Sequence, residues 1–155
     1  RIPDIERFAT ELLSVMGFDD FRVSVEPASG VDPWRLTVAM REGRFLIGRG
    51  GENLQAFEHL VRVLLARRFG ADIPTVVCDI NNYRHERAEY LRAVARSVAQ
   101  RVKLEGRPVS LRPMSAFDRR VVHLELSTRP DVVTESEGSG LERRIVVKPY
   151  GSQTV

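Results

Sequence analysis

A glycine cluster, Gly48-Arg49-Gly50-Gly51, lies between two segments whose apolar residues recur with helical spacing. Glycine adopts positive φ angles at little cost and lets other backbone approach closely, so the cluster predicts a tight loop between two helices. The N–H groups of such a loop and the positive end of the following helix can hold an anion, and Arg49 adds a full charge. A Walker loop is excluded because no Gly-Lys-Ser/Thr follows, and a dinucleotide-binding loop is disfavoured because the cluster does not directly follow a strand. A plain tight turn is the alternative interpretation.

The first half of the chain alternates helical and strand-like patterns. Apolar residues at helical spacing predict helices over residues 4–17, 45–47 and 52–69. Alternation of apolar and polar residues predicts strands over residues 21–25, 34–40 and 75–80. The expected order of elements is therefore α-β-β-α-α-β. Trp34, Phe45 and Phe57 fit buried core positions in this scheme.

The second half has a different order. Helices are expected over residues 85–104 and 115–128, and strands over residues 109–111, 132–137 and 142–148. Gly138-Ser139-Gly140 predicts a hairpin between the last two strands. The order here is α-β-α-β-β. We expect an α+β protein of two small domains, residues 1–82 and 83–150, followed by a C-terminal tail, residues 151–155.

The helix that begins near Ser115 carries a second candidate site. Ser115-Ala-Phe-Asp118 is a variant of the capping box. At about 100° per residue, the apolar stripe is expected to consist of Phe117, Val121 and Leu124. Arg119 and His123 then lie one turn apart on the exposed side, where they can contact a phosphate or a base. A local surface hydrogen bond is the alternative role for this pair.

The cationic residues are almost all arginines. The 155 residues include 24 Lys and Arg against 21 Asp and Glu, and only Lys103 and Lys148 are lysines. Arginine binds phosphate bidentately and stacks on bases, although the codon usage of a GC-rich genome is an equally good explanation. The arginines on the helix over residues 85–104 are most simply a solvated face, and contact with nucleic acid is the alternative.

Other features exclude whole classes of protein. No apolar run approaches the roughly 18 residues of a membrane span, no signal peptide is recognisable, and the single cysteine, Cys78, excludes a disulfide framework and a cysteine-based zinc site. We therefore expect a cytoplasmic protein, without cofactor or metal, and, because it starts at Arg1, a part of a longer product. A metal-dependent nuclease is disfavoured because the spacing of the candidate carboxylates matches no ligand motif: Asp79, Asp118, Glu125, Glu135 and Glu137.

Both halves resemble known domains. Ile47 and the Gly-x-x-G cluster, within the α-β-β-α-α-β order, resemble a type II KH domain, whose loop clamps the backbone of about four nucleotides. Three stretches of the second half are similar to the R-three-H domain, which binds single-stranded nucleic acid: Pro113 to His123, Val133 to Gly138 and Arg143 to Val147. Arg119 and His123 match its Arg-x-x-x-His motif.

A KH domain followed directly by an R-three-H domain resembles the bacterial Jag family, also called KhpB or SpoIIIJ-associated proteins. Two differences stand out: Gly50 replaces the second basic residue usual in the loop, and the small N-terminal domain of many members is absent from this sequence. The resemblance implies an RNA-binding regulator without catalytic activity, a small KH-only protein partner and proximity to the membrane-insertion machinery.

We therefore expect the chain to bind single-stranded RNA. The expected binding residues are Gly48, Arg49, Gly50, Gly51, Arg119, Arg120, His123 and Arg144. Two alternatives are open. A protein-interaction adaptor would keep the fold without the nucleic-acid site, and Gly50 is the feature that favours it. Binding of single-stranded DNA is the other, because no feature of the sequence selects the 2′-hydroxyl of RNA.

Overall fold

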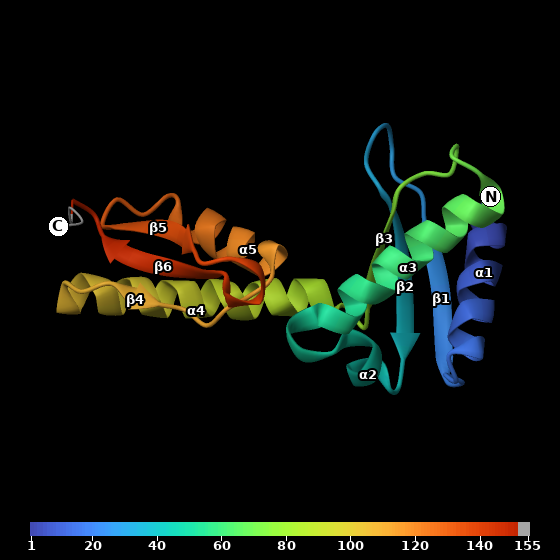
Figure 1. Ribbon diagram of the computed structural model, residues 1–155, viewed down its shortest axis with the longest axis horizontal. Coiled ribbons are helices and arrows are strands. Elements are labelled where there is room, and N and C mark those ends of the chain that lie inside the picture. Colours follow the sequence, from blue (N-terminus) through green and yellow to red (C-terminus); the bar gives the residue numbers. More distant parts are fainter. Residues whose placement is uncertain (152–155) are drawn as a thin grey trace. The chain divides into compact units, whose positions relative to one another are not determined.

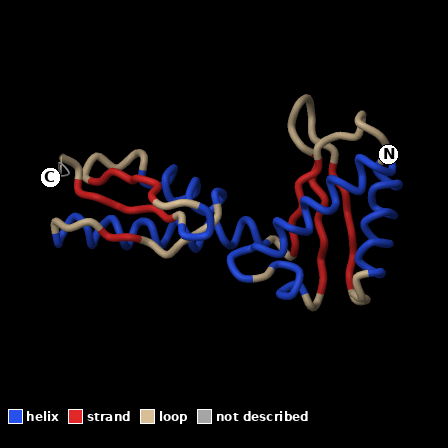
Figure 2. The backbone as a smooth tube through the Cα atoms, viewed as in Figure 1, coloured by secondary structure: helices blue, strands red, loops and turns tan. Residues whose placement is uncertain are grey.

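Two three-stranded sheets, each with its own helices, make up the computed structural model, which describes residues 1–151 (Figure 1, Figure 2). The chain divides into two compact units, Arg1–Arg84 and the part that begins at His85. The expected tail, residues 151–155, lies outside the described residues apart from Gly151.

The first unit has the predicted α-β-β-α-α-β order. Its elements are α1 (Ile2–Val15), β1 (Phe21–Glu26), β2 (Trp34–Met40), α2 (Gly43–Ile47), the 3-10 turn η1 (Arg49–Gly51), α3 (Glu52–Phe69) and β3 (Val76–Ile80). The sheet order is β1-β2-β3. β2 pairs antiparallel with β1, with Val38 opposite Val23, and parallel with β3, with Leu36 opposite Cys78.

One face of this sheet packs on α1 and α3 (Figure 1). Leu36 and Val38 of β2 are fully buried, together with Leu13 of α1 and Val61 of α3. The periodicities of two and of 3.6 residues that the sequence shows are the direct result of this one-sided burial. Phe57 is buried as predicted, but the prediction for Phe45 is wrong: its side chain on α2 is 59% exposed and the Arg44 guanidinium stacks on its ring, 4.8 Å from the centroid.

The outer edge of β3 is closed by side chains. The Cys78 N–H donates to Glu58 Oε2 at 2.9 Å, and Arg84 Nε donates to the Cys78 carbonyl at 2.9 Å. Glu58 and Arg84 also pair with each other, with 2.7 Å between Oε2 and Nη2. These contacts satisfy backbone groups that would otherwise offer an edge for another strand, and they fix the first turn of the next helix to the first unit.

The second unit has the predicted α-β-α-β-β order. Its elements are α4 (Tyr83–Glu105), whose first two residues belong to the first unit, β4 (Val109–Ser110), α5 (Ala116–Leu126), β5 (Val132–Glu137), the 3-10 turn η2 (Gly140–Glu142) and β6 (Arg144–Pro149). The antiparallel sheet has the order β4-β6-β5. β5 and β6 form the expected hairpin, with Glu137 opposite Arg144. The core joins Leu91 of α4, Val122 of α5 and Val147 of β6.

Candidate nucleic-acid interface

The glycine loop has a backbone that few other residues could follow. Gly48, Gly50 and Gly51 have φ angles of 72°, 59° and 82°. A side chain at φ values of this kind costs roughly 1–2 kcal/mol per residue because Cβ crowds the following carbonyl. The three glycines therefore allow the chain to leave α2, make the turn η1 and enter α3 within four residues.

Two of these glycines are also required by their neighbours. A Cβ at Gly48 would lie 2.6 Å from Cγ of Asn53, whose Nδ2 donates to the Phe45 carbonyl at 2.8 Å. A Cβ at Gly51 would lie 2.9 Å from Cε1 of Tyr83, the first residue of α4. Gly50 differs, because a Cβ there would meet nothing within 4 Å. The loop is thus packed at both ends and open in the middle.

The polar groups of the open part suit an anion. The Gly48 N–H donates to the Arg44 carbonyl and the Gly51 N–H to the Gly48 carbonyl. Within residues 1–151, the N–H groups of Arg49 and Gly50 meet no backbone acceptor, which makes them the donors of the loop for an outside ligand. The Arg49 side chain is exposed beside them, and the N-terminus of the 18-residue α3 follows directly. Glu52 in its first turn is the one opposing charge there.

The support of this loop was not anticipated from the sequence. Asn81 and Asn82 have φ angles of 52° and 59°, and the Asn81 amide accepts from the Met40 N–H at 2.9 Å and donates to the Met40 carbonyl at 2.8 Å. This turn places Tyr83 against Gly51. Two consecutive asparagines directly after a strand were the available signal, since asparagine tolerates the left-handed region better than most residues.

The helix α5 begins as predicted. The Ser115 hydroxyl accepts from the Asp118 N–H at 3.2 Å. Arg119 is half-buried and its Nη1 donates to the Met114 carbonyl at 2.7 Å. His123 is exposed, and its Nδ1 lies 2.6 Å from Oγ1 of Thr134 on β5. The motif residues therefore lie one turn apart, and each has a local hydrogen bond.

The predicted buried stripe of α5 is wrong for Phe117 and Leu124, whereas Val121 is partly buried and packs against the core. Phe117 is 37% and Leu124 56% exposed, whereas Asp118 is 2% exposed. Asp118 Oδ2 accepts from Nη2 of Arg87 at 2.9 Å and from its Nε at 3.2 Å. A buried carboxylate is tolerated when it is paired in this way. The helical wheel places apolar residues on the buried face and charged residues on the exposed face. It therefore could not predict that α5 buries the face that carries Asp118 and Val122.

Arg120 and Arg144 are both exposed, but on different elements. Arg120 lies on α5. Ile145 and Val147 of β6 point into the core, so by the alternation of a strand Arg144 points to the other face of the sheet. The structure thus brings Arg119, Arg120 and His123 together on one helix and places Arg144 on the face of the sheet that α5 does not cover.

The arginines of α4 are largely engaged. Arg92 pairs with Glu89 at 2.5 Å, Arg96 with Glu125 at 2.8 Å and Arg101 with Glu105 at 3.3 Å. Such exposed pairs contribute little stability, yet they neutralise the positive charge of the helix. They favour the interpretation of this face as solvated.

The remaining candidates of the sequence are the Cys78 thiol and the carboxylates. Burial, and then the nearby Glu58 carboxylate, raise the pKa of the Cys78 thiol to about 12, which disfavours the nucleophilic thiolate. Across residues 1–151, no three His, Cys, Asp or Glu side chains gather in a way that could hold a metal ion. In the same residues, no helix has the length and apolar character needed to cross a membrane.

The chain is similar to known proteins over most of its length. Residues 89–149 match the R-three-H domain. The RNA-binding protein KhpB of Streptococcus pneumoniae strain D39 is 31% identical over 148 residues, which is 93% of this chain and 45% of that protein. The KhpB proteins of Clostridium symbiosum and Bacillus subtilis strain 168 are 36% and 30% identical over 66% and 73% of this chain. The chain spans about half the length of these relatives, 46% and 55% of the latter two.

Proposed function

Because residues 89–149 belong to the R-three-H domain family and the chain is homologous to part of the KhpB proteins, we propose that it binds single-stranded RNA and has no catalytic role. The observation that carries this proposal is the glycine loop, with its open middle, two N–H groups for which no backbone acceptor is found in residues 1–151, and one exposed arginine in front of a long helix. Its homologues are named RNA-binding proteins.

The loop would hold the sugar-phosphate backbone. A phosphate oxygen can accept from the N–H groups of Arg49 and Gly50, while the Arg49 guanidinium and the positive end of α3 supply charge. The absence of a side chain at Gly50 leaves room for the ribose to approach closely. Packing by Asn53 and Tyr83 keeps this geometry in place before RNA arrives.

The helix α5 would supply the second contact. One Nη of Arg119 is bonded to Met114, but a guanidinium has five N–H donors, so the others can reach a phosphate. The Nδ1 of His123 is engaged with Thr134, which leaves Nε2 and the ring face for a base. Arg120 would add charge on the same helix, whereas Arg144 would act only on RNA that passes the other face of the sheet.

The further partners are proposals from family resemblance. The partners are a small KH-only protein and the membrane-insertion machinery. The proposed location is the cytoplasm. Single-stranded DNA is the alternative ligand. The adaptor alternative is favoured by two observations: the loop carries a single basic side chain, and the arginines of α4 are paired with carboxylates.

The test is a titration of labelled single-stranded RNA, single-stranded DNA and duplex RNA at two salt concentrations. We expect single strands to bind more tightly than duplex, with a log–log salt slope of about −0.7 per phosphate contacted. The double variant Arg49→Asp, Gly50→Asp should bind RNA at least tenfold more weakly, a loss of about 1.4 kcal/mol. Gly50→Ala is the matched control, because it places a side chain at the same positive φ angle without adding negative charge.

Binding that does not respond to salt, or no binding at micromolar protein, would instead favour the adaptor. An unchanged affinity in the folded double variant would show that the loop is not the RNA contact.

A further inference from the structure

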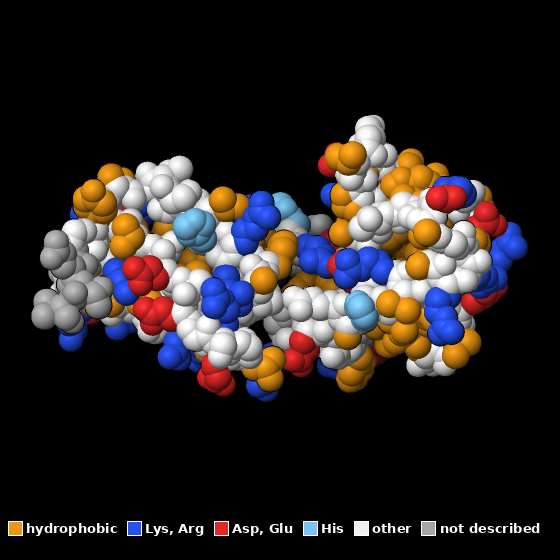
Figure 3. Space-filling model, turned by 45° about the horizontal axis from the view of Figure 1, so that its top comes forward, with side chains coloured by type: hydrophobic (Ala, Val, Ile, Leu, Met, Phe, Trp, Pro, Cys, Tyr) orange, Lys and Arg blue, Asp and Glu red, His pale blue; other side chains and the backbone are white. Residues whose placement is uncertain are grey.

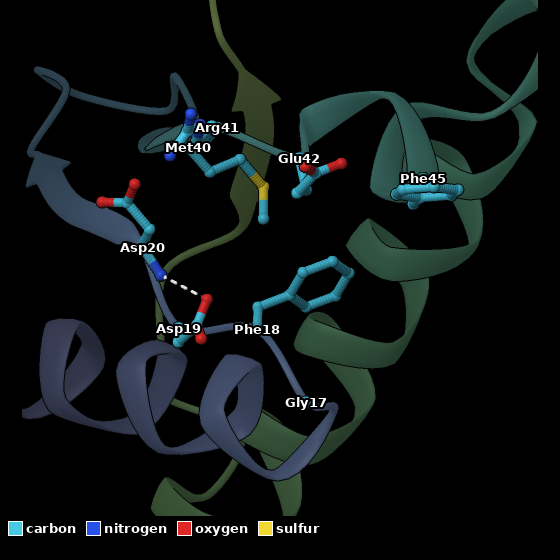
Figure 4. Close-up of a pocket in the computed structure, with 8 residues that line it drawn as sticks. All are labelled: Gly17, Phe18, Asp19, Asp20, Met40, Arg41, Glu42 and Phe45. Carbon is cyan, nitrogen blue, oxygen red and sulfur yellow. Dashed lines mark hydrogen bonds between the residues drawn. The ribbon is translucent and has the colours of Figure 1, made fainter.

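A hollow of about 690 Å³ opens in the first unit at the end of the sheet where α1 turns into β1 and β2 turns into α2. Its volume lies within the range of sites that bind small ligands and single side chains. The proposed RNA contacts use none of the residues that line it: Gly17, Phe18, Asp19, Asp20, Met40, Arg41, Glu42 and Phe45. Figure 4 shows these side chains around the space.

The floor of the hollow is apolar. The Phe18 ring and the Met40 thioether both extend into it, and Phe45 on α2 borders it (Figure 4). Phe45 is 59% exposed. An apolar ring that stays exposed at the border of a hollow offers a surface that another molecule can cover.

The acidic side chains around the opening of the hollow favour a positively charged ligand. Among the lining residues, Asp19, Asp20 and Glu42 contribute three carboxylates and Arg41 one guanidinium. Arg44, which contacts Glu42 and the Phe45 ring, is a second cation at the edge. Asp19 Oδ1 accepts from the Asp20 N–H at 3.0 Å, and Glu42 has only a loose, exposed contact with Arg44 at 3.8 Å. The C-terminal end of α1, whose last turn holds no basic residue, adds partial negative charge. A phosphate backbone would be repelled here.

We propose that this pocket binds a segment of a partner protein that presents an arginine or lysine beside an apolar side chain. The aliphatic stem of the basic residue would lie over Phe18, Met40 and Phe45, and its charged head would meet the carboxylates of the rim. Arg44, which already stacks on Phe45 with 4.8 Å to the ring centroid, shows that this ring accepts a guanidinium.

The probe for this site is a blocked Leu-Arg-Leu tripeptide, titrated into the full chain and followed by the amide shifts of the lining residues. Blocked Leu-Glu-Leu is the matched probe of opposite charge. We expect saturable shifts at Phe18, Asp20 and Glu42 with Leu-Arg-Leu only, and weaker binding at high salt. Arg41→Gln should tighten the binding, since it removes a competing cation.

The carboxylates are tested by Asp19→Asn, Asp20→Asn and Glu42→Gln together, which should raise the dissociation constant of Leu-Arg-Leu at least tenfold. The control changes the net charge equally at the other end of the sheet, by three substitutions: Glu26→Gln, Asp32→Asn and Asp72→Asn. It should change the constant less than twofold.

Three results would overturn the proposal: no saturable shift with Leu-Arg-Leu, an equal response to Leu-Glu-Leu, or an equal loss in both triple variants. A ten-residue oligouridine that shifts the same amides and displaces the tripeptide would overturn it too, because the pocket would then belong to the RNA path. None of these four results depends on whether RNA binds at the glycine loop, so this proposal and the proposed function can fail separately.

Discussion

At the scale of single residues, Gly51 and Gly50 have different reasons to be glycine. Both have positive φ, but only Gly51 has another side chain, Tyr83, at the place where its Cβ would lie. Gly51 is buried and Gly50 exposed. Gly51 therefore maintains the packing of the loop, and Gly50 leaves its outer surface open.

We expect Gly51→Ala to lower the free energy of unfolding more than Gly50→Ala. Gly50→Ala should cost about 1–2 kcal/mol, from the left-handed backbone alone. Gly51→Ala adds a contact of 2.9 Å with the Tyr83 ring, which must shift. Urea unfolding of both variants measures the difference. The double variant Tyr83→Ala, Gly51→Ala should lose less than the sum of the losses of its two single variants, because the contact between the two positions is then gone. Equal losses in Gly50→Ala and Gly51→Ala would show that Tyr83 yields without cost.

Cys78 gives the protein a dependence of stability on alkaline pH. Its thiol is 1% exposed, and burial raises its pKa from 9.0 to about 12. The neutral thiol is thus favoured in the folded state, so this contribution is fully present below pH 9. Above that pH the unfolded chain ionises first, and the contribution is lost progressively as the pH rises toward about 12.

We expect the free energy of unfolding to fall by up to about 1.4 kcal/mol per pH unit above pH 9 through this group. Cys78→Val, a buried side chain of similar size, should remove this slope. Urea unfolding at several pH values between 8 and 10 tests it, because other titrating groups cancel in the difference between the two proteins. Parallel curves for both proteins would contradict the expectation.

At the scale of elements, the sequence predicted the order of helices and strands because each packs one face on a core and so carries a regular period. It could not predict the rotation of α5, since the buried Asp118 is partnered by Arg87, 31 residues earlier in the chain. It also missed Asn81 and Tyr83, whose roles depend on Met40 and Gly51. What escaped prediction are side-chain contacts between segments distant in sequence.

The RNA contact proposed for α5 can be tested by substitution. We expect Arg119→Ala with His123→Ala to weaken the binding of single-stranded RNA at least tenfold, about 1.4 kcal/mol, with a small change in melting temperature. The control is Thr134→Val, which removes the hydrogen-bond partner of His123 and keeps both motif side chains. It should leave RNA affinity nearly unchanged.

The alternative is that Arg119 and His123 serve only their local hydrogen bonds. In that case the double variant would lose stability, its binding would fall only in proportion to the unfolded fraction, and Thr134→Val would reproduce part of the effect. Thermal unfolding and RNA titration of the same samples separate the two roles.

At the scale of the whole molecule, the excess of positive charge is small. Basic and acidic side chains are interspersed on the face that Figure 3 shows, and the net charge is only +3. With so little excess charge, the attraction of the chain as a whole to RNA is weak. Binding would then depend on two small sites on one chain, the loop and α5, which raise each other's effective concentration when one strand reaches both.

This dependence predicts a step in affinity with RNA length. An oligonucleotide of about four nucleotides would fill the loop alone, and we expect longer single strands to bind more than tenfold more tightly once they reach α5 as well. A longer strand also offers the loop more positions at which to bind, which raises affinity without a second contact. The double variant Arg119→Ala, His123→Ala is the reference, because its affinity should still rise for this reason but should not show the additional tenfold increase. Fluorescence anisotropy with a series of oligouridines measures both curves. If the two proteins gain affinity with length in parallel, the second site does not act on the strand that the loop holds, and the two units bind RNA separately.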